Sequence, residues 1–292
     1  MSSNDWGKNN LPYFSIFHDF FLVFLRPERI KAITYYFFLN KNKKQLLGIL
    51  VYILIIVIII IFLAKNKYIE LFEDDKEGLN KCDGIVYVNL ENREDRKKIF
   101  LEEIKKMNIK NENKLHKVSG VFMPNNGHKG NVQSFIIALM LAKLNEWDMV
   151  CIFEDDAEII NTNNFSKDCE YIINKLNENE PKWDVIMLGT AHSKKENVLF
   201  DDRICKIKSA TTKTCIIVKK HYYDKLINNF KSSNDLMLGS KKTSYNYEKY
   251  ASDQRMQVLQ ETGKWFGFHK DIIKQRDIWS STMRYSYGNT NN

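Results

Sequence analysis

From Cys82 onward, short runs of β-branched and aromatic residues alternate with longer runs whose apolar residues recur at helical spacing. GIVYVNL, Gly84 to Leu90, is typical of a buried strand, and Asn131 to Glu146 is typical of a strongly apolar helix. Strands separated by helices predict an α/β domain with a largely parallel sheet, which binds ligands at the carboxyl ends of its strands. We place this domain at residues 82–282 and a tail at 283–292.

The same pattern predicts where the remaining elements lie. A helix begins at Asn92, which is a candidate N-cap because Glu94 and Asp95 follow in the first turn. Residues 231–252 show little periodicity and are rich in Ser, Lys and Tyr, so a surface loop is expected there. The other expected strands are Met149 to Phe153, Trp183 to Gly189, Ile204 to Lys208 and Thr214 to Val218, and the other expected helices are Phe165 to Asn177 and His221 to Phe230.

The most apolar stretch, LLGILVYILIIVIIIIFLA, covers Leu46 to Ala64 and contains no charged residue. At about 1.5 Å of rise per residue it spans roughly 28 Å, close to the hydrocarbon thickness of a bilayer. It therefore predicts one transmembrane helix at 46–64, followed by a stalk at 65–81. The Lys and Arg residues of segment 1–45 favour a cytoplasmic location for that segment. The protein is thus expected to be a single-pass type II membrane protein whose domain is lumenal (endoplasmic reticulum or Golgi) or otherwise extracytoplasmic.

The charge distribution argues against a nucleic-acid partner. The formal net charge is +8, of which residues 1–45 contribute +4 (seven Lys/Arg against three Asp/Glu), so the remainder also contributes +4. A large domain with so small an excess is nearly balanced, and its sequence has no basic stripe interleaved with aromatic residues. The five cysteines include no C-x-x-C pair, and Cys205 and Cys215 either form a disulfide or are buried thiols in strands.

Three adjacent carboxylates stand where the expected strand 149–153 ends. CIFEDDAEII, Cys151 to Ile160, places Glu154, Asp155 and Asp156 between two apolar runs. Neighbouring carboxylates repel one another, and crowding them beside a core destabilises a fold unless a cation or hydrogen-bond donors compensate. Two interpretations follow: either Asp155 or Asp156 caps a following helix, or the acids hold a metal ion.

Six short motifs occur in order along the domain. They are VYVNLENREDR (Val86 to Arg96), HKGNVQSF (His128 to Phe135), IFEDDAEI (Ile152 to Ile159), WDVIMLG (Trp183 to Gly189), SDQRM (Ser252 to Met256) and IIKQRDIWSS (Ile272 to Ser281). Together they resemble glycosyltransferase family 25, the lipopolysaccharide and procollagen galactosyltransferase type, over about residues 85–281. The family has a histidine after the serine of the second motif, whereas this chain has Phe135 after Ser134.

The resemblance implies a GT-A fold, a UDP-sugar donor and a divalent cation, Mn²⁺ or Mg²⁺. The expected fold class is therefore α/β: a GT-A type nucleotide-sugar-binding domain with a largely parallel sheet, preceded by a single transmembrane helix. The expected function is membrane-anchored, metal-dependent transfer of a hexose (galactose or glucose) from the UDP-sugar to a hydroxyl of a glycan or protein. The alternative is a catalytically inactive, membrane-anchored binding or scaffold protein of the same fold, suggested by Phe135.

In this interpretation the three acids provide the ligands of the metal ion. Along a strand, Glu154 and Asp156 point to the same side, and a hard divalent cation prefers oxygen ligands and can bridge two phosphates. Asp156 is the expected metal ligand, and Glu154 is a second ligand or a ribose contact. Asp155 is the alternative to Asp156 and otherwise binds the donor. His269 is expected to complete the metal shell, as a late histidine does in related folds.

Further residues are expected to bind the donor or to act on the acceptor. Arg93 and Arg96, with Asn89 of the same motif, are expected donor contacts. Lys129 and Gly130 precede a helix and offer charge and close backbone approach to phosphate or sugar. The resemblance implies inversion at the sugar carbon, which needs a general base for the acceptor hydroxyl. Asp253 matches a late acidic residue of the family and is expected to be that base, or to hydrogen-bond the donor sugar.

Overall fold

The computed structural model describes residues 52, 55–59, 62, 77–239 and 248–278. The chain divides into two compact units, Met1–Glu70 and Leu71–Asn292. The described residues of the first unit are helical and exposed. All strands discussed below belong to the second unit.

The structure corrects the expected membrane span. Within the described residues, no helix is both long enough and apolar enough to cross a membrane. This finding overturns the fold class and the location predicted above, both of which included a single-pass transmembrane helix at 46–64. Segments 1–45 and 65–76, most of 46–64 and the tail at 283–292 lie outside the described residues.

An eight-stranded sheet forms the centre of the domain, in the order β2-β1-β3-β8-β5-β9-β7-β6. Its strands are β1 (Gly84–Asn89), β2 (Leu115–Ser119), β3 (Met149–Glu154), β5 (Val185–Met187), β6 (Ala191–Val198), β7 (Asp201–Thr211), β8 (Cys215–Lys219) and β9 (Trp265–Phe268). The pairs β1–β2, β1–β3 and β5–β9 are parallel, whereas β3–β8, β5–β8, β7–β9 and β6–β7 are antiparallel. The sheet is therefore mixed, and the prediction of a largely parallel sheet is wrong. β4 (Ala157–Ile159) and β10 (Ile273–Gln275) form a separate antiparallel pair.

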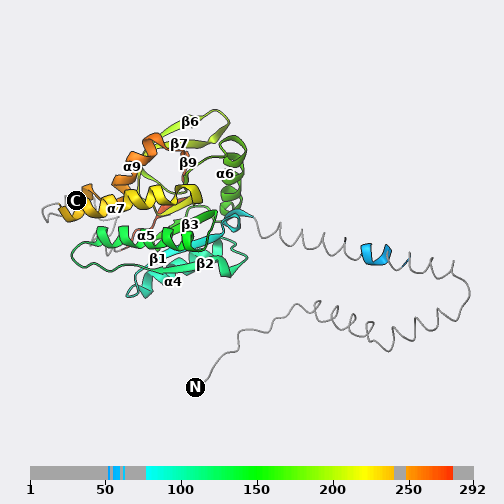
Figure 1. Cartoon of the computed structure of the whole chain (residues 1–292), viewed down its shortest axis with the longest axis horizontal. Coiled ribbons are helices and arrows are strands. Elements are labelled where there is room, and N and C mark those ends of the chain that lie inside the picture. The colour runs from blue at the N-terminus through cyan, green and yellow to red at the C-terminus, as the bar shows by residue number, and fades with distance from the viewer. Residues whose placement is uncertain (1–51, 53–54, 60–61, 63–76, 240–247, 279–292) are drawn as a thin grey trace, which may run out of the picture. The chain divides into compact units, whose positions relative to one another are not determined.

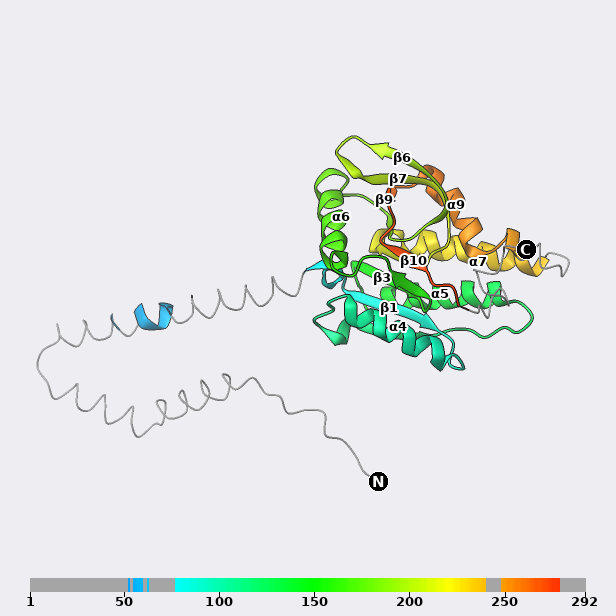
Figure 2. The same ribbon diagram turned by 180° about the vertical axis from the view of Figure 1, so that it is seen from behind.

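Helices cover both faces of the sheet and give a three-layer α/β/α arrangement, which Figures 1 and 2 show from opposite sides. One face packs against α4 (Glu94–Lys106) and α6 (Phe165–Asn179). The other face packs against α5 (Gly127–Leu144), α7 (Tyr223–Gly239) and α9 (Ser252–Thr262).

Because side chains alternate along a strand, one strand contributes side chains to the cores on both faces of the sheet. In β1, Ile85 and Tyr87 belong to the core on the α4 side, and Val86 and Val88 belong to the core on the α5 side. Successive side chains of a strand point to opposite faces, so a strand covered on both faces must be apolar throughout. This requirement accounts for the continuous apolar runs from which β1 and β3 were predicted close to their observed bounds.

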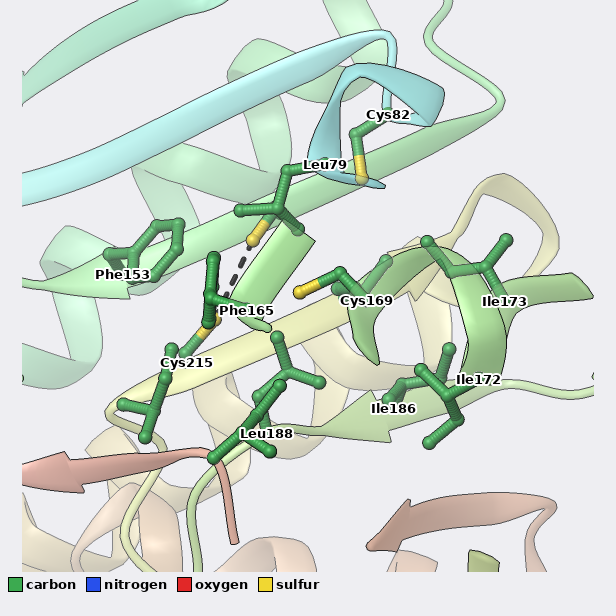
Figure 3. Packing of buried hydrophobic residues seen from close by; sticks show 14 of the residues in the cluster. Leu79, Cys82, Phe153, Phe165, Cys169, Ile172, Ile173, Ile186, Leu188 and Cys215 are labelled. Atoms are coloured by element: carbon green, nitrogen blue, oxygen red, sulfur yellow. Dashed lines mark hydrogen bonds between the residues drawn. The ribbon is translucent and has the colours of Figure 1, made fainter. Parts of the chain in front are cut away.

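The core on the α4 side, which also includes side chains of α6, contains most of the cysteines (Figure 3). All five are buried and free, and the Sγ atoms of Cys151 and Cys215 lie 3.6 Å apart. Cys205 lies in β7, where its Sγ donates to the carbonyl oxygen of Gly267 at 3.4 Å. Of the two interpretations of Cys205 and Cys215, the structure supports buried thiols in strands.

Several local expectations differ from the structure. The last part of the expected stalk is a 3₁₀ turn, Gly78–Lys81, whose Leu79 is fully buried in the core, so these residues belong to the domain. α4 has Arg93 at its N-cap in place of the expected Asn92. α7 continues to Gly239 and so replaces the first part of the expected loop, while residues 240–247 lie outside the described part of the chain.

Candidate active site

The three acids lie at the carboxyl end of β3, between two strands of the structure. Glu154 is the last residue of β3, Asp155 and Asp156 form a turn, and β4 begins at Ala157. The next helix, α6, begins only at Phe165, after Asn164 as N-cap. The helix-capping interpretation of Asp155 and Asp156 is therefore wrong, and another interaction must compensate their charges.

A buried arginine compensates two of the three carboxylates. Arg96 lies in the first turn of α4, and its guanidinium pairs with both aspartates. Nη1 lies 3.1 Å from Asp155 Oδ1, and Nη2 donates to Asp156 Oδ2. Asp155 also accepts a 2.7 Å hydrogen bond from Asn89 Nδ2, and Asp156 accepts a 3.0 Å bond from Gln275 Nε2. A planar fork that spans two acids is a geometry that Arg provides and Lys does not.

The third carboxylate has partners of its own. Glu154 Oε1 accepts from Lys213 Nζ at 2.9 Å and from Asn131 Nδ2 at 2.9 Å. Lys213 Nζ also donates to Asn131 Oδ1, which closes a three-membered polar cluster between β3, α5 and the segment after β7. The amide of Glu154 donates to the carbonyl of Thr214 at 2.9 Å, so the backbone holds the same segments together.

The surroundings shift the pKa values of the acids in opposite directions. Burial, followed by the charge of Glu154, raises the pKa of Asp156 to about 6, although Arg96 acts to lower it. Burial also raises the pKa of Asp155, against the opposing effect of Arg96 and Asn89. Burial disfavours ionised Glu154, but the Lys213 ammonium and the Asn131 amide outweigh it and lower the pKa. Ionised Asp156 is therefore the least compensated charge of the cluster.

The acids face a cleft of about 350 Å³. Its walls come from the loop after β2, the N-terminal turn of α5, the turn between β7 and β8, and the start of α9. Glu154, Asp155, Asp156, Arg96 and Asp253, all predicted site residues, line this cleft together. The structure therefore places these five residues at one cleft, although they come from the end of β3, from α4 and from α9.

Other predicted donor contacts lie outside the lining of the cleft. Asn89 lies behind Asp155 and supports it by hydrogen bonding. Arg93 donates to Asp95 through Nε at 2.9 Å and Nη2 at 2.8 Å. Neither Arg93 nor Lys129 is among the described residues that line the cleft.

Gly130 has a packing role. A Cβ atom at this position would lie 2.2 Å from the carbonyl oxygen of Val121, so only glycine lets α5 approach the loop after β2 so closely. Ser134 closes the same contact, because its Oγ accepts from Val121 N at 2.8 Å and donates to Gly130 O at 2.7 Å. The glycine and serine of this motif position one wall of the cleft.

His269 lies apart from the acids. It lines a second cleft with residues 197–202 of the β6–β7 connection, and its backbone amide donates to Arg203 O at 3.0 Å. The structure does not bring His269 together with Asp156 and Glu154 as metal ligands. The histidines that line the acidic cleft in the described residues are His128 and His192.

Sequence reasoning missed Lys213, Asn131, Gln275 and His128 as site residues. Asn131 and His128 lie in the glycine-led motif, and Gln275 lies in the closing motif, so the motifs themselves were the available signal. Lys213 lies outside every motif, and nothing near it in the sequence distinguishes it from an exposed lysine.

His128 predicts a pH dependence of stability. Burial lowers its pKa, while Asp253 and Glu248 act to raise it and Lys213 acts to lower it. A histidine whose pKa is lower in the folded state binds a proton more readily when the chain is unfolded. The free energy of unfolding therefore decreases as the pH falls below the pKa of the unfolded state, about 6.5. We expect wild type to lose more free energy of unfolding than His128→Gln between about pH 7.5 and about pH 5.5. Urea unfolding at both pH values measures this difference, and equal losses would contradict it.

The donor set of the acids fits a divalent cation that is shared with a substrate. With all groups ionised, three carboxylates face one guanidinium and one ammonium, which leaves one negative charge. Asp156 Oδ1 is buried and has no hydrogen-bond partner among the described residues. Mg²⁺-type sites often use one or two carboxylates plus substrate phosphates. A self-contained group of three or more His, Cys, Asp or Glu metal ligands does not occur in the described part of the chain.

No protein-family model matches this chain, and no curated protein matches it. Solved structures similar to it include A197 from STIV, at 11% identity and TM-score 0.37, over 65% of this chain and 83% of that one. Another is a glycosyltransferase involved in the glycosylation of the major capsid of PBCV-1, at 13% identity and TM-score 0.38, over 65% and 82%. A third is mannose-1-phosphate geranyltransferase from Thermus thermophilus, at 5% identity and TM-score 0.34, over 63% and 58%. All three TM-scores lie below 0.5, and likenesses at this level transfer neither a fold nor an activity to this chain.

Proposed function

We propose that this protein is a glycosyltransferase that moves a hexose, galactose or glucose, from a UDP-sugar to a hydroxyl of a glycan or protein. The observation that carries the proposal is the cluster of Glu154, Asp155 and Asp156 facing a cleft at the carboxyl end of β3. β1 and β3 are parallel neighbours, and α/β sheets bind ligands at this end of such strands. The six motifs that resemble glycosyltransferase family 25 supply the reaction class.

The three acids have two different tasks in this proposal. Asp156 and Glu154 would hold a divalent cation, Mn²⁺ or Mg²⁺, which when bound neutralises charge on the departing diphosphate. Asp155 has Arg96 as the partner of one carboxylate oxygen and Asn89 as the partner of the other, so in this proposal it holds the turn in place. Arg96 favours the ionised form of both aspartates and fixes their positions before substrate binds.

The acceptor hydroxyl must lose its proton, and two cleft residues can accept it. Asp253 lies in the first turn of α9 and is our assigned general base. His128 is the second candidate, because its lowered pKa leaves it neutral at neutral pH. We expect Asp253→Asn to lower kcat by about 100-fold or more and His128→Gln to have a smaller effect. Steady-state transfer assays on both variants decide between them, and the reverse ranking would reassign the base to His128.

Ligand binding tests the proposal before any acceptor is known. We expect the full chain to bind UDP in the presence of Mn²⁺ or Mg²⁺ with a Kd of about 1 μM to 1 mM, the usual range for enzyme substrates. Isothermal titration calorimetry measures the affinity, and hydrolysis across a panel of nucleotide sugars identifies the donor. Failure to bind UDP or any other nucleoside diphosphate with either metal would refute the glycosyltransferase assignment.

One observation favours a second candidate, an inactive binding protein of the same fold. Phe135 is fully buried where the family resemblance places a histidine. A chain that binds UDP and metal but neither hydrolyses nor transfers any sugar of the panel would support this alternative.

A further inference from the structure

The space beside Phe135 contains a cation from a distant part of the chain. The Nζ of Lys213 lies 4.0 Å from the centroid of the Phe135 ring, within cation–π distance. The ring is fully buried and packs edge-on against Phe230, with centroids 6.2 Å apart. Phe135 therefore supports a positive charge at the wall of the cleft.

Lys213 is buried to an unusual degree for a lysine. Its side chain is 4% exposed, yet it lines the acidic cleft. Burial of an ammonium ion is costly unless it is paired, and Glu154 and Asn131 supply that pairing. An ammonium has three N–H donors, and the hydrogen bonds to Glu154 and Asn131 use two of them, which leaves one N–H for a ligand.

The backbone that delivers Lys213 is strained. Thr212 has φ of 62°, a left-handed conformation that is unfavourable for a non-glycine residue. On one side, Thr211 Oγ1 donates to Ala191 O at 3.1 Å; on the other, Thr214 O accepts from Glu154 N at 2.9 Å. Strain of this kind persists where surrounding contacts enforce it, and such positions cluster at functional sites. The turn is thus held in the conformation that brings Lys213 to the end of β3.

The balance of charges singles out Lys213 as an anion contact. Among the described residues, Arg96 and Lys213 are the Lys or Arg side chains that line the cleft. The guanidinium of Arg96 spans two aspartates, whereas the ammonium of Lys213 pairs with one carboxylate. Lys213 is therefore the cation better able to meet an incoming anion.

We propose that Lys213 is a binding residue for the diphosphate of the donor, supported by the face of Phe135, and that it gives the cleft affinity for diphosphate without a metal ion. This inference rests on the proposed function. It assigns a role to a residue outside every motif and explains why Phe135 is compatible with a working site.

The test measures binding of UDP and UMP to the full chain by calorimetry, in EDTA and in Mn²⁺. We expect wild type to bind UDP in EDTA, and Lys213→Met to weaken that binding by about 10- to 100-fold, the value of one charge-assisted hydrogen bond. The preference for UDP over UMP should fall in the same variant. Lys213→Arg should recover part of the lost affinity, because it retains the charge. Lys264→Met removes an equal charge outside the cleft, where Lys264 pairs with Glu180, and should bind UDP as wild type does.

A matched pair controls for folding, since Lys213→Met leaves Glu154 buried without its ion pair. Glu154→Gln and the double variant Glu154→Gln/Lys213→Met both avoid an unpaired buried carboxylate at this position. We expect the double variant to bind UDP in EDTA about 10-fold or more weakly than Glu154→Gln. If the two variants bind UDP with equal affinity while wild type still binds it, the role of Lys213 is refuted and the proposed function is not. No UDP binding by wild type under any condition overturns the proposed function and this inference with it.

Discussion

Replacing Arg96 with methionine is expected to lower the free energy of unfolding by about 3–5 kcal/mol near neutral pH. The guanidinium is buried against Asp155 and Asp156, with Nη1 3.1 Å from Asp155 Oδ1. Its removal leaves two buried carboxylates without their cation, and the cost of uncompensated buried charge exceeds the loss of packing. Guanidinium chloride unfolding monitored by circular dichroism measures the change.

A surface pair on the same helix provides the control. Lys97 Nζ lies 3.2 Å from Glu94 Oε2 on the exposed side of α4, and such pairs contribute about 0–1 kcal/mol. Lys97→Met should therefore change stability little. Adding Asp156→Asn to Arg96→Met should recover part of the loss, because one of the two stranded charges is then absent. A cost below about 1 kcal/mol for Arg96→Met would mean that Arg96 does not compensate the acids.

Replacing Asp156 with asparagine is expected to separate stability from ligand binding. Burial and the charge of Glu154 raise the pKa of Asp156 to about 6, so near neutral pH its ionised form is held against an unfavourable environment. The neutral amide removes this cost, and the ligand-free variant should melt at or above the temperature of wild type. The same change removes the proposed cation ligand. It should remove the part of the stabilisation by Mn²⁺ plus UDP that depends on the metal ion; for wild type the total stabilisation is about 2.7 kcal/mol at 100 times Kd.

Thermal unfolding with and without Mn²⁺ plus UDP measures both effects. Asp202→Asn is a matched control, because Asp202 is exposed and lines the second cleft, beside His269. That variant should keep the full ligand response. An Asp156→Asn variant that melts lower than wild type and still responds fully to the ligands would place the cation elsewhere.

The elements that were predicted well are those whose burial leaves a clear local pattern in the sequence. β1 and β3 are continuous apolar runs, α6 is a strongly amphipathic helix, and the bounds of all three follow from local periodicity. β6, with the sequence AHSKKENV, is mostly exposed and polar, so no local pattern marks it as a strand. It forms because β7 is available as an antiparallel partner, which is a property of the folded chain.

The relative direction of neighbouring strands could not be predicted from local sequence patterns either. Helices between strands predicted parallel neighbours, but β8 lies antiparallel between β3 and β5. β7 and β8 run in the same direction, and the short connection between them passes through Thr212, whose left-handed conformation no local pattern indicates. A β-branched residue is not expected to adopt a left-handed conformation, and only the surrounding contacts enforce it.

Local patterns were enough to predict an α/β domain that includes the residues from Cys82 onward, acids at the end of β3, and Arg96 and Asp253 as site residues. They also suggested a membrane span that no described helix supports. The folded chain was needed to show that Arg96 pairs with Asp155 and Asp156, that His269 lies in another cleft, and that Lys213 lines the site. The physical reason is separation along the chain: Lys213 meets Glu154 across 59 residues because β8 lies beside β3. Local patterns record which residues must be buried, whereas pairing between distant strands determines which charges meet.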